Sequence, residues 1–290
     1  MEANEIISKV RHIEIKARGL SRQLFAGEYH SAFKGKGMAF NEVREYQFGD
    51  DIRSIDWNVT ARFNHPFVKI FEEERELTVM LLIDVSKSSF FGSDQIKNEL
   101  IIEIAGVLSF SAYQNNDKVG AIFFSETIEK FIPPQKGSKH ILRIIREMLT
   151  FNPLNNKTDI QVPLQFLTNV IKKRATVFLI SDFQSKNYQK AIQIANRRHD
   201  MVALRIIDRR ETEMVNVGIL KIADPETNEE FWMDTSSAKV RKQYVDNWNS
   251  FNSTTDDILI KNGIDNVKLF TNKDYVKPLI NLFKQRGARF

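Results

Sequence analysis

The chain of 290 residues contains no cysteine and only five histidines, and these two shortages exclude several classes of site. Without cysteine there are no disulfides, no thiolate zinc sites and no cysteine nucleophile, and the composition is compatible with a reducing compartment. The histidines are His12, His30, His65, His140 and His199. None of them falls in a strand-end loop that we place near Ser86 or Ser88, which argues against a Ser-His-Asp hydrolase.

Long apolar runs are also missing. The longest are "VMLLI" and "VFLI", far below the roughly 18 residues that cross a bilayer as a helix. The first residues, "MEANEIISKVRHIEIK", lack the basic start and short apolar run of a secretory signal. These features predict a cytoplasmic protein without membrane insertion.

The positive charge is modest and scattered. The net charge is +5 with a pI near 9.2. Basic clusters such as 172–174 and 209–210 are short, which is typical of solvated surfaces rather than of a nucleic-acid interface. No G-x-G-x-x-G or G-x-x-x-x-G-K-[ST] loop follows a predicted strand, so the sequence offers no nucleotide-phosphate loop.

The spacing of apolar residues predicts three segments. Residues 1–26 are expected to contain a helix on the domain body, with a partner-binding or dimerisation helix as the alternative. Residues 27–76, rich in glycine, aromatic and charged residues, are expected to form a β-rich extension. Residues 77–290 alternate between strand and helix patterns, which predicts an α/β fold with a doubly wound, mostly parallel sheet.

The expected elements of the long segment can be given by range. Strands are expected at 77–83, 118–125, 127–134, 175–181, 200–208 and 266–271, with a further hairpin at 217–234. Helices are expected at 94–113, 138–149, 158–173, 187–198 and 273–286, and a helix or helix pair at 236–263. The hairpin of 118–134 is expected to end at Pro133 and Pro134, since proline cannot continue a ladder of hydrogen bonds.

The stretch "LLIDVSKSSFFG" ends the first of these strands on Asp84 and continues with Ser86 and Ser88. In an extended loop, side chains at alternate positions project the same way, so one carboxylate and two hydroxyls converge. Oxygen ligands without histidine or cysteine favour Mg²⁺, with Mn²⁺ and Ca²⁺ as alternatives. The pattern is short, and Ser and Asp also cap helices, so it needs support from elsewhere in the chain.

That support comes from two later segments. "NNKTDI" presents Thr158 before a predicted helix, and "VFLISDF" ends a buried strand on Asp182. In open α/β sheets ligands bind outside the carboxyl ends of the strands, where both loops should lie. With these residues the chain resembles the von Willebrand factor A family and its metal-ion-dependent adhesion site. The resemblance implies a site made of Asp84, Ser86, Ser88, Thr158 and Asp182.

In that family the hydroxyls typically bind the ion directly, and the aspartates often act through water. A partner protein supplies a carboxylate to the ion. The family's usual glycine after the final aspartate is Phe183 here, which puts the shape of the loop in question rather than a ligand.

A second resemblance is more specific. "GKGMAFNEVREYQFGDDIRSIDWNVTAR" and "VKIFEEERELTVMLLIDVSKS" look like the bacterial domain-of-unknown-function 58 family, over residues 35–92. Members are often encoded beside MoxR-type AAA+ ATPases, so the resemblance implies such an ATPase as a partner.

The first of these stretches holds another group of residues: Arg44, Tyr46, Gly49, Asp50, Asp51, Arg53, Asp56, Trp57 and Arg62. We expect a turn at 49–51, pairing between arginines and carboxylates, and Trp57 buried against the main domain. The alternative is a partner-docking surface.

These observations favour a non-catalytic interaction protein that binds a divalent cation and, through it, a protein partner. A Mg²⁺-dependent phosphoryl-transfer or hydrolytic enzyme is one alternative, but an aspartyl nucleophile would require a carboxylate where Ser86 stands. A nucleic-acid-binding module is the other alternative.

Overall fold

The computed structural model describes residues 3–25, 39–72, 77–90, 96–153, 155, 157–223 and 230–288. Contacts along the chain define two compact units. One unit is Lys34–Leu77, and the other joins Met1–Phe33 with Thr78–Phe290. Among the described residues, no helix is long and apolar enough to cross a membrane.

The larger unit is built on a six-stranded sheet in the order β10-β7-β6-β3-β4-β5. The strands are β3 (Thr78–Asp84), β4 (Lys118–Phe124), β5 (Ile128–Gln135), β6 (Thr176–Ser181), β7 (Asp200–Ile207) and β10 (Asp265–Phe270). Every neighbouring pair is parallel except β4 and β5, which form an antiparallel hairpin at one edge. The predicted α/β class with a doubly wound, mostly parallel sheet is therefore confirmed.

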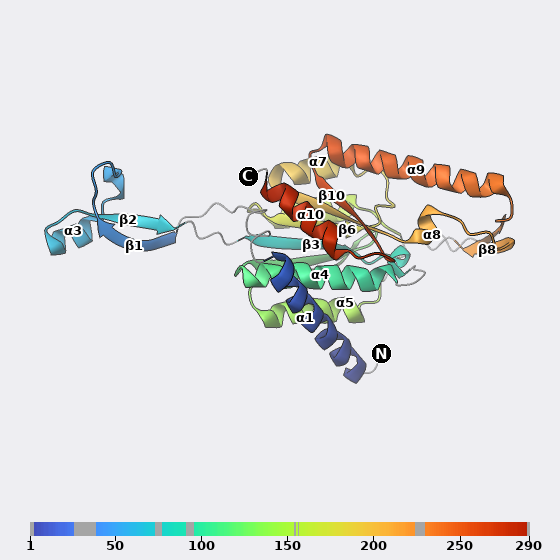
Figure 1. Ribbon diagram of the computed structural model, residues 1–290, viewed down its shortest axis with the longest axis horizontal. Coiled ribbons are helices and arrows are strands. Elements are labelled where there is room, and N and C mark those ends of the chain that lie inside the picture. Colours follow the sequence, from blue (N-terminus) through green and yellow to red (C-terminus); the bar gives the residue numbers. More distant parts are fainter. Residues whose placement is uncertain are drawn as a thin grey trace. The chain divides into compact units, whose positions relative to one another are not determined.

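Helices cover both faces of this sheet (Figure 1). They are α1 (Ala3–Phe25), α4 (Lys97–Gln114), α5 (Ser138–Thr150), α6 (Gln161–Val170), α7 (Gln189–Arg198), the short α8 (Arg209–Thr212), α9 (Ala238–Lys261) and α10 (Val276–Gly287). A hairpin of β8 (Ile219–Ala223) and β9 (Glu230–Asp234) precedes α9. The segment for which a helix or a helix pair was expected is one long helix.

Alternation along the strands separates two cores. Met80 and Leu82 of β3 face the core that contains Leu164 of α6 and Ile192 of α7. The other face is covered by α4 and α10, where Phe178 of β6 packs edge-on against Phe283 with ring centroids 6.3 Å apart. Because β3 and β6 are buried on both faces, they read as continuous apolar runs in the sequence.

The first helix packs on the body of the larger unit, as the preferred interpretation expected. Ile13 and Ala17 of α1 are buried. Their partner is Gly106 of α4, where an added Cβ would lie 3.1 Å from Ile13 Cγ2. A larger residue at this position would require Ile13 to shift by a few tenths of an ångström, so glycine favours the close approach of α1 to α4.

The hairpin prediction needs one correction. Pro133 and Pro134 do not end β5, since Gln135 follows them in the strand and still pairs with Val119. β5 is an edge strand with an irregular register near this point, and edge positions tolerate residues that lack an N–H donor.

The smaller unit contains the strands β1 (Ala39–Glu45) and β2 (Phe67–Glu72), which pair antiparallel, the short 3₁₀ helix η1 (Ile52–Ser54) and the helix α3 (Trp57–Phe63). The sequence indicated short strands and turns here, but α3 was not foreseen. Asp56 caps this helix by accepting hydrogen bonds from the N–H groups of Asn58 and Val59.

Candidate metal centre

Asp84 ends β3 with both carboxylate oxygens held in place. Its Oδ1 accepts hydrogen bonds from the Ser86 N–H at 3.0 Å and the Ser86 hydroxyl at 2.6 Å. Its Oδ2 accepts one from the Ser181 hydroxyl at 2.6 Å. Asp84 is only 2% exposed, so these bonds replace the water that burial removes.

The serine loop turns directly after the strand, where residues 87–90 form the 3₁₀ helix η2. The hydroxyl oxygens of Ser86 and Ser88 lie 3.0 Å apart. The Ser89 hydroxyl donates to the Ser86 carbonyl at 2.6 Å and closes the turn. The predicted convergence of Asp84, Ser86 and Ser88 is thus present.

Asp182 lies beside this loop because β6 pairs with β3 in parallel, so both strands end at the same edge of the sheet. Asp182 follows Ser181, the last residue of β6, whose hydroxyl bonds to Asp84, and Asp182 and Ser88 line the same cavity. The Gln184 N–H donates to Asp182 Oδ1 at 3.1 Å. Two loops far apart in sequence therefore meet.

The segment that carries Thr158 is tied to both neighbouring strand ends. The Asp159 N–H donates to the carbonyl of Ser125, just after β4, and the Ile160 N–H donates to the Ser185 hydroxyl, just after Asp182. β3 lies between β4 and β6, so the segment spans the edge where β3 ends. The Thr158 hydroxyl oxygen is buried and has no hydrogen-bond partner. A buried hydroxyl oxygen without a hydrogen-bond partner is available to bind a cation.

Lys97, Ser181 and Glu211 belong to the same cluster and were not identified from the sequence. Lys97 Nζ lies 2.7 Å from Asp182 Oδ2 and 2.6 Å from Glu211 Oε1. Two signals were available: Lys97 is a lone cation at the start of a largely apolar helix, and Ser181 directly precedes Asp182. Glu211 gave no such signal, because α8 follows a different strand.

Burial and charge act differently on the two aspartates. Burial, reinforced by the neighbouring Asp182, raises the pKa of Asp84 to about 6. Burial also pushes the pKa of Asp182 upward, but the charge and hydrogen bond of Lys97 outweigh it, so that this pKa is lowered. Asp182 is therefore held as a carboxylate by an internal cation, whereas Asp84 has no cation of its own.

A cavity of about 970 Å³ opens beside these residues. Ser88, Asp182 and Glu211 line it on one side. Tyr244, Trp248 and other side chains of α9 line it on the other. The cluster thus borders a space large enough for several side chains of another molecule.

The donor set fits a small hard cation. Two carboxylates and three hydroxyls offer oxygen atoms alone, which Mg²⁺ prefers. No group of three or more His, Cys, Asp or Glu side chains suited to a metal occurs in the described parts of the chain. An ion here would therefore depend on the serine and threonine oxygens as much as on the aspartates.

The second predicted group of residues makes contacts within the smaller unit. Arg44 and Asp50 form the expected pair, with two hydrogen bonds of 2.9 and 2.7 Å. Gly49 has a φ of 109°, as the predicted turn requires. Asp51 caps η1 through the Arg53 N–H, as Asp56 caps α3.

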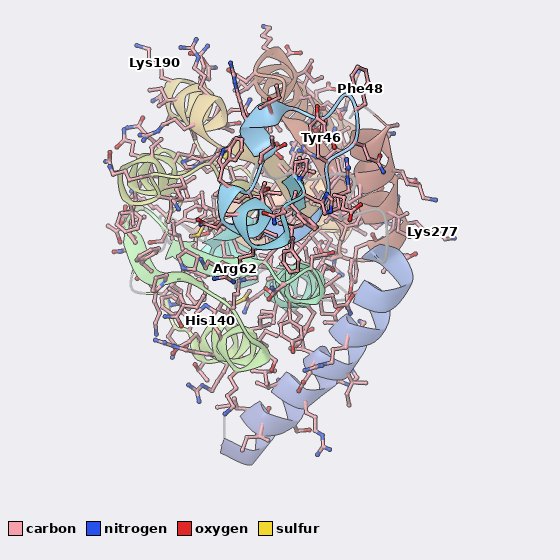
Figure 2. The ribbon with its side chains drawn as sticks, turned by 90° about the vertical axis from the view of Figure 1, so that its left-hand side faces the viewer. Tyr46, Phe48, Arg62, His140, Lys190 and Lys277 are labelled. Atoms are coloured by element: carbon pink, nitrogen blue, oxygen red, sulfur yellow. The ribbon has the colours of Figure 1, made fainter. Side chains whose placement is uncertain are left out.

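Within the smaller unit Trp57 is not covered: as the first residue of α3 it is 67% exposed. Its burial against the main domain stays a prediction. Phe48, at the outer tip of the turn that follows Tyr46, is fully exposed, and Arg62 is exposed on α3 (Figure 2). These contacts and caps stabilise the unit and assign it no chemistry.

Known structures resemble the fold. An aerotolerance-related membrane protein from Bacteroides fragilis NCTC 9343, with multiple mutations to serines, aligns with a TM-score of 0.51 and 13% identity, over 74% of this chain and 100% of that one. This likeness shows the fold alone. The VWA domain of SpRpn10 aligns over 71% of this chain and 94% of that one at 9% identity, but its TM-score of 0.40 is too low to carry an argument.

Relatives in sequence include the uncharacterized protein Rv1480 of Mycobacterium tuberculosis (strain ATCC 25618 / H37Rv), 27% identical over 227 residues, 77% of this chain and 72% of that protein. The uncharacterized protein YeaD of Bacillus subtilis (strain 168) is 26% identical over 106 residues, 37% of this chain and 25% of that protein. The family model described as "Protein of unknown function DUF58" matches residues 42–252, well over half of the chain. The chain therefore belongs to the DUF58 family, whose function is unknown.

Proposed function

We propose that this protein is a non-catalytic interaction module. It binds a divalent cation, Mg²⁺ first and Mn²⁺ or Ca²⁺ as alternatives, and it binds a partner protein through that ion. The ligands are Asp84, Ser86, Ser88, Thr158 and Asp182. The observation that carries the proposal is the meeting of the Asp84–Ser86–Ser88 network with the end of β6, which carries Asp182, at one sheet edge. The segment with the unpartnered Thr158 hydroxyl is tied to the same edge.

An ion at this site would act as a bridge. Mg²⁺ usually keeps water at some positions, and a carboxylate from an acidic residue of the partner would replace one of these waters. The cavity beside Ser88 and Asp182 provides room for the segment that carries that residue.

Catalysis is less well supported. Ser86 stands where an aspartyl phosphotransferase would need its acid, and its hydroxyl is engaged by Asp84. Three histidines are described in the larger unit, and none has a contact with Asp84. His12 is exposed on α1. His140 Nε2 lies 2.9 Å from the Val119 carbonyl, and both nitrogens of His199 are buried without hydrogen-bond partners.

The partner class follows from the resemblance alone. A MoxR-type AAA+ ATPase, acting with this protein in the assembly or maturation of other proteins, stays a prediction. A cytoplasmic location stays a prediction as well.

The test is calorimetric titration of the metal-free protein with Mg²⁺ and Mn²⁺. Saturable binding is expected in the wild type and in an Asp246→Asn control, which removes an exposed carboxylate of α9. The Asp84→Ala, Ser86→Ala variant should lose binding. Equal binding by that variant and the wild type would refute the site.

A further inference from the structure

We propose that Lys97 is an internal counter-cation with two effects. It lowers the affinity of the site for the metal ion, and it raises the affinity of the metal-loaded site for an acidic ligand. The inference rests on the proposed function, and it assigns a role to two residues outside the ligand set, Lys97 and Glu211.

The placement of Lys97 is the first reason. Its side chain is 1% exposed, and its Nζ lies within 2.7 Å of both Asp182 Oδ2 and Glu211 Oε1. Removing an ammonium from water is costly, and apolar residues in place of a whole buried ion pair often give equal or greater stability. A lysine buried at a candidate ligand therefore calls for a role other than packing.

Glu211 fixes Lys97 from the opposite side. Its Oε2 accepts from the Asp208 N–H at 3.0 Å, as part of the capping box that starts α8. Its Oε1 also accepts from Gln184 Nε2 at 3.3 Å. The Asp208 N–H and the Gln184 side chain both fix the position of the Glu211 carboxylate. Glu211 therefore still binds Lys97 when Asp182 binds a metal ion.

Charge balance gives the consequence for the metal. Asp182 shares its Oδ2 with the Lys97 ammonium, so a divalent cation competes with Lys97 for that ligand and is repelled by it. The repulsion between a monovalent and a divalent cation a few ångströms apart is substantial in water and stronger in a buried site of lower dielectric constant. Lys97 thus lowers the affinity for the metal.

The same balance gives the consequence for the ligand. Asp84, Asp182 and Glu211 together with Lys97 carry two net negative charges, which one divalent cation neutralises. Without Lys97 the loaded site would keep a negative charge and repel a carboxylate. Lys97 therefore lowers the affinity for the metal ion and raises the affinity of the loaded site for acidic ligands. These ligands reach the site through the cavity lined by Ser88 and Glu211.

The test uses two titrations on each variant. In the first, Mg²⁺ is titrated into the metal-free protein, and in the second, the peptide acetyl-Ala-Glu-Ala-amide is titrated into the Mg²⁺-saturated protein. Lys97→Met should bind Mg²⁺ roughly tenfold more tightly and the peptide more weakly. Glu211→Gln should bind Mg²⁺ more weakly, since Lys97 then serves Asp182 alone.

Two further variants control for folding and for general charge effects. Lys97→Met with Glu211→Gln removes both members of the pair, preserves the net charge and should still bind Mg²⁺ more tightly than the wild type, since Asp182 is no longer shared. Lys16→Met removes a half-exposed lysine paired with Glu103 at 2.7 Å and should leave both titrations unchanged.

The outcomes separate the inference from the proposed function. If the wild type binds Mg²⁺ and the Asp84→Ala, Ser86→Ala variant does not, but Lys97→Met binds Mg²⁺ equally or more weakly, Lys97 is only structural and the inference is overturned. A structural role also predicts that both affinities fall together. If neither the wild type nor any Lys97 variant binds Mg²⁺, the proposed function fails and the inference fails with it.

Discussion

The Ser181 hydroxyl donates a 2.6 Å hydrogen bond to Asp84 Oδ2, and this bond joins the ends of β6 and β3. Ser181 Oγ also accepts the Phe183 N–H at 2.9 Å. One buried hydroxyl therefore orients Asp84 and the loop that carries Asp182.

Ser181→Ala should lower the free energy of unfolding by about 1–3 kcal/mol, because Asp84 Oδ2 would remain buried without its donor. Ser109 provides a matched control, since its hydroxyl is buried with no hydrogen-bond partner. Ser109→Ala should be neutral or stabilising. Urea denaturation of both variants measures the difference, and equal losses would contradict the role given to Ser181.

Phe183 stands where the von Willebrand factor A family usually has glycine, and its φ of 63° is the left-handed conformation that favours glycine. Its ring is fully buried, with its centroid 6.1 Å from that of Tyr188. Phe183→Ala should cost about 3–5 kcal/mol of stability. Phe183→Gly loses the same ring but removes roughly 1 kcal/mol of backbone strain, so it should be the more stable of the two. A less stable glycine variant in urea denaturation would show that φ at this position is unstrained.

His199 should make stability depend on pH. Burial, helped by the charges of Arg198 and Arg174, lowers its pKa to about 4, from 6.5 in an unfolded chain. The unfolded state therefore binds the proton more readily, so stability is full above pH 6.5 and is lost as the pH falls through 4. The loss should approach about 3 kcal/mol. The urea midpoint of the wild type should be lower at pH 4.5 than at pH 7.5, and His199→Leu should make this difference smaller. A difference that is unchanged in the variant would exclude His199 as its source.

Asp84 should make metal binding depend on pH in a separate window. With a pKa raised to about 6, it gains a proton below that pH, and the proton competes with the cation. Mg²⁺ affinity should be constant above pH 7 and fall roughly tenfold per unit below pH 6. In the metal-free protein the sign is opposite, because the stability linked to neutral Asp84 is present below its unfolded pKa of 3.8 and lost as the pH rises through 6. Calorimetry at pH 7.5 and 5.0 with equal affinities would contradict this.

Asp50→Asn tests whether the pair with Arg44 is structural. Arg44 and the Gln47 N–H both bond to this carboxylate and lower its pKa. The variant should be cleaved faster by protease within the turn of 46–51 while Mg²⁺ affinity stays that of the wild type. Unchanged proteolysis would favour the partner-docking alternative.

Much of the fold was predictable because burial requires apolar residues at regular positions along the sequence. Strands buried on both faces, such as β3 and β6, must be apolar at every position, and the helices between them repeat apolar residues every three or four positions. α3 escaped prediction because its seven residues are too few for such a repeat.

The candidate site divides in the same way. Asp84, Ser86 and Ser88 are neighbours in sequence, so the sequence by itself determined that they lie together, although they converge in the turn that leads into η2 and not in an extended loop. That the Thr158 segment and Asp182 lie at the same sheet edge depends on the order of the strands, which the parallel pairing of β3 with β6 and β4 brings about. Lys97 and Glu211 are 114 positions apart, and only tertiary structure brought them into contact. A charged side chain such as that of Lys97 can be buried only where an opposite charge lies beside it. When that partner is distant in sequence, no local sequence pattern identifies it.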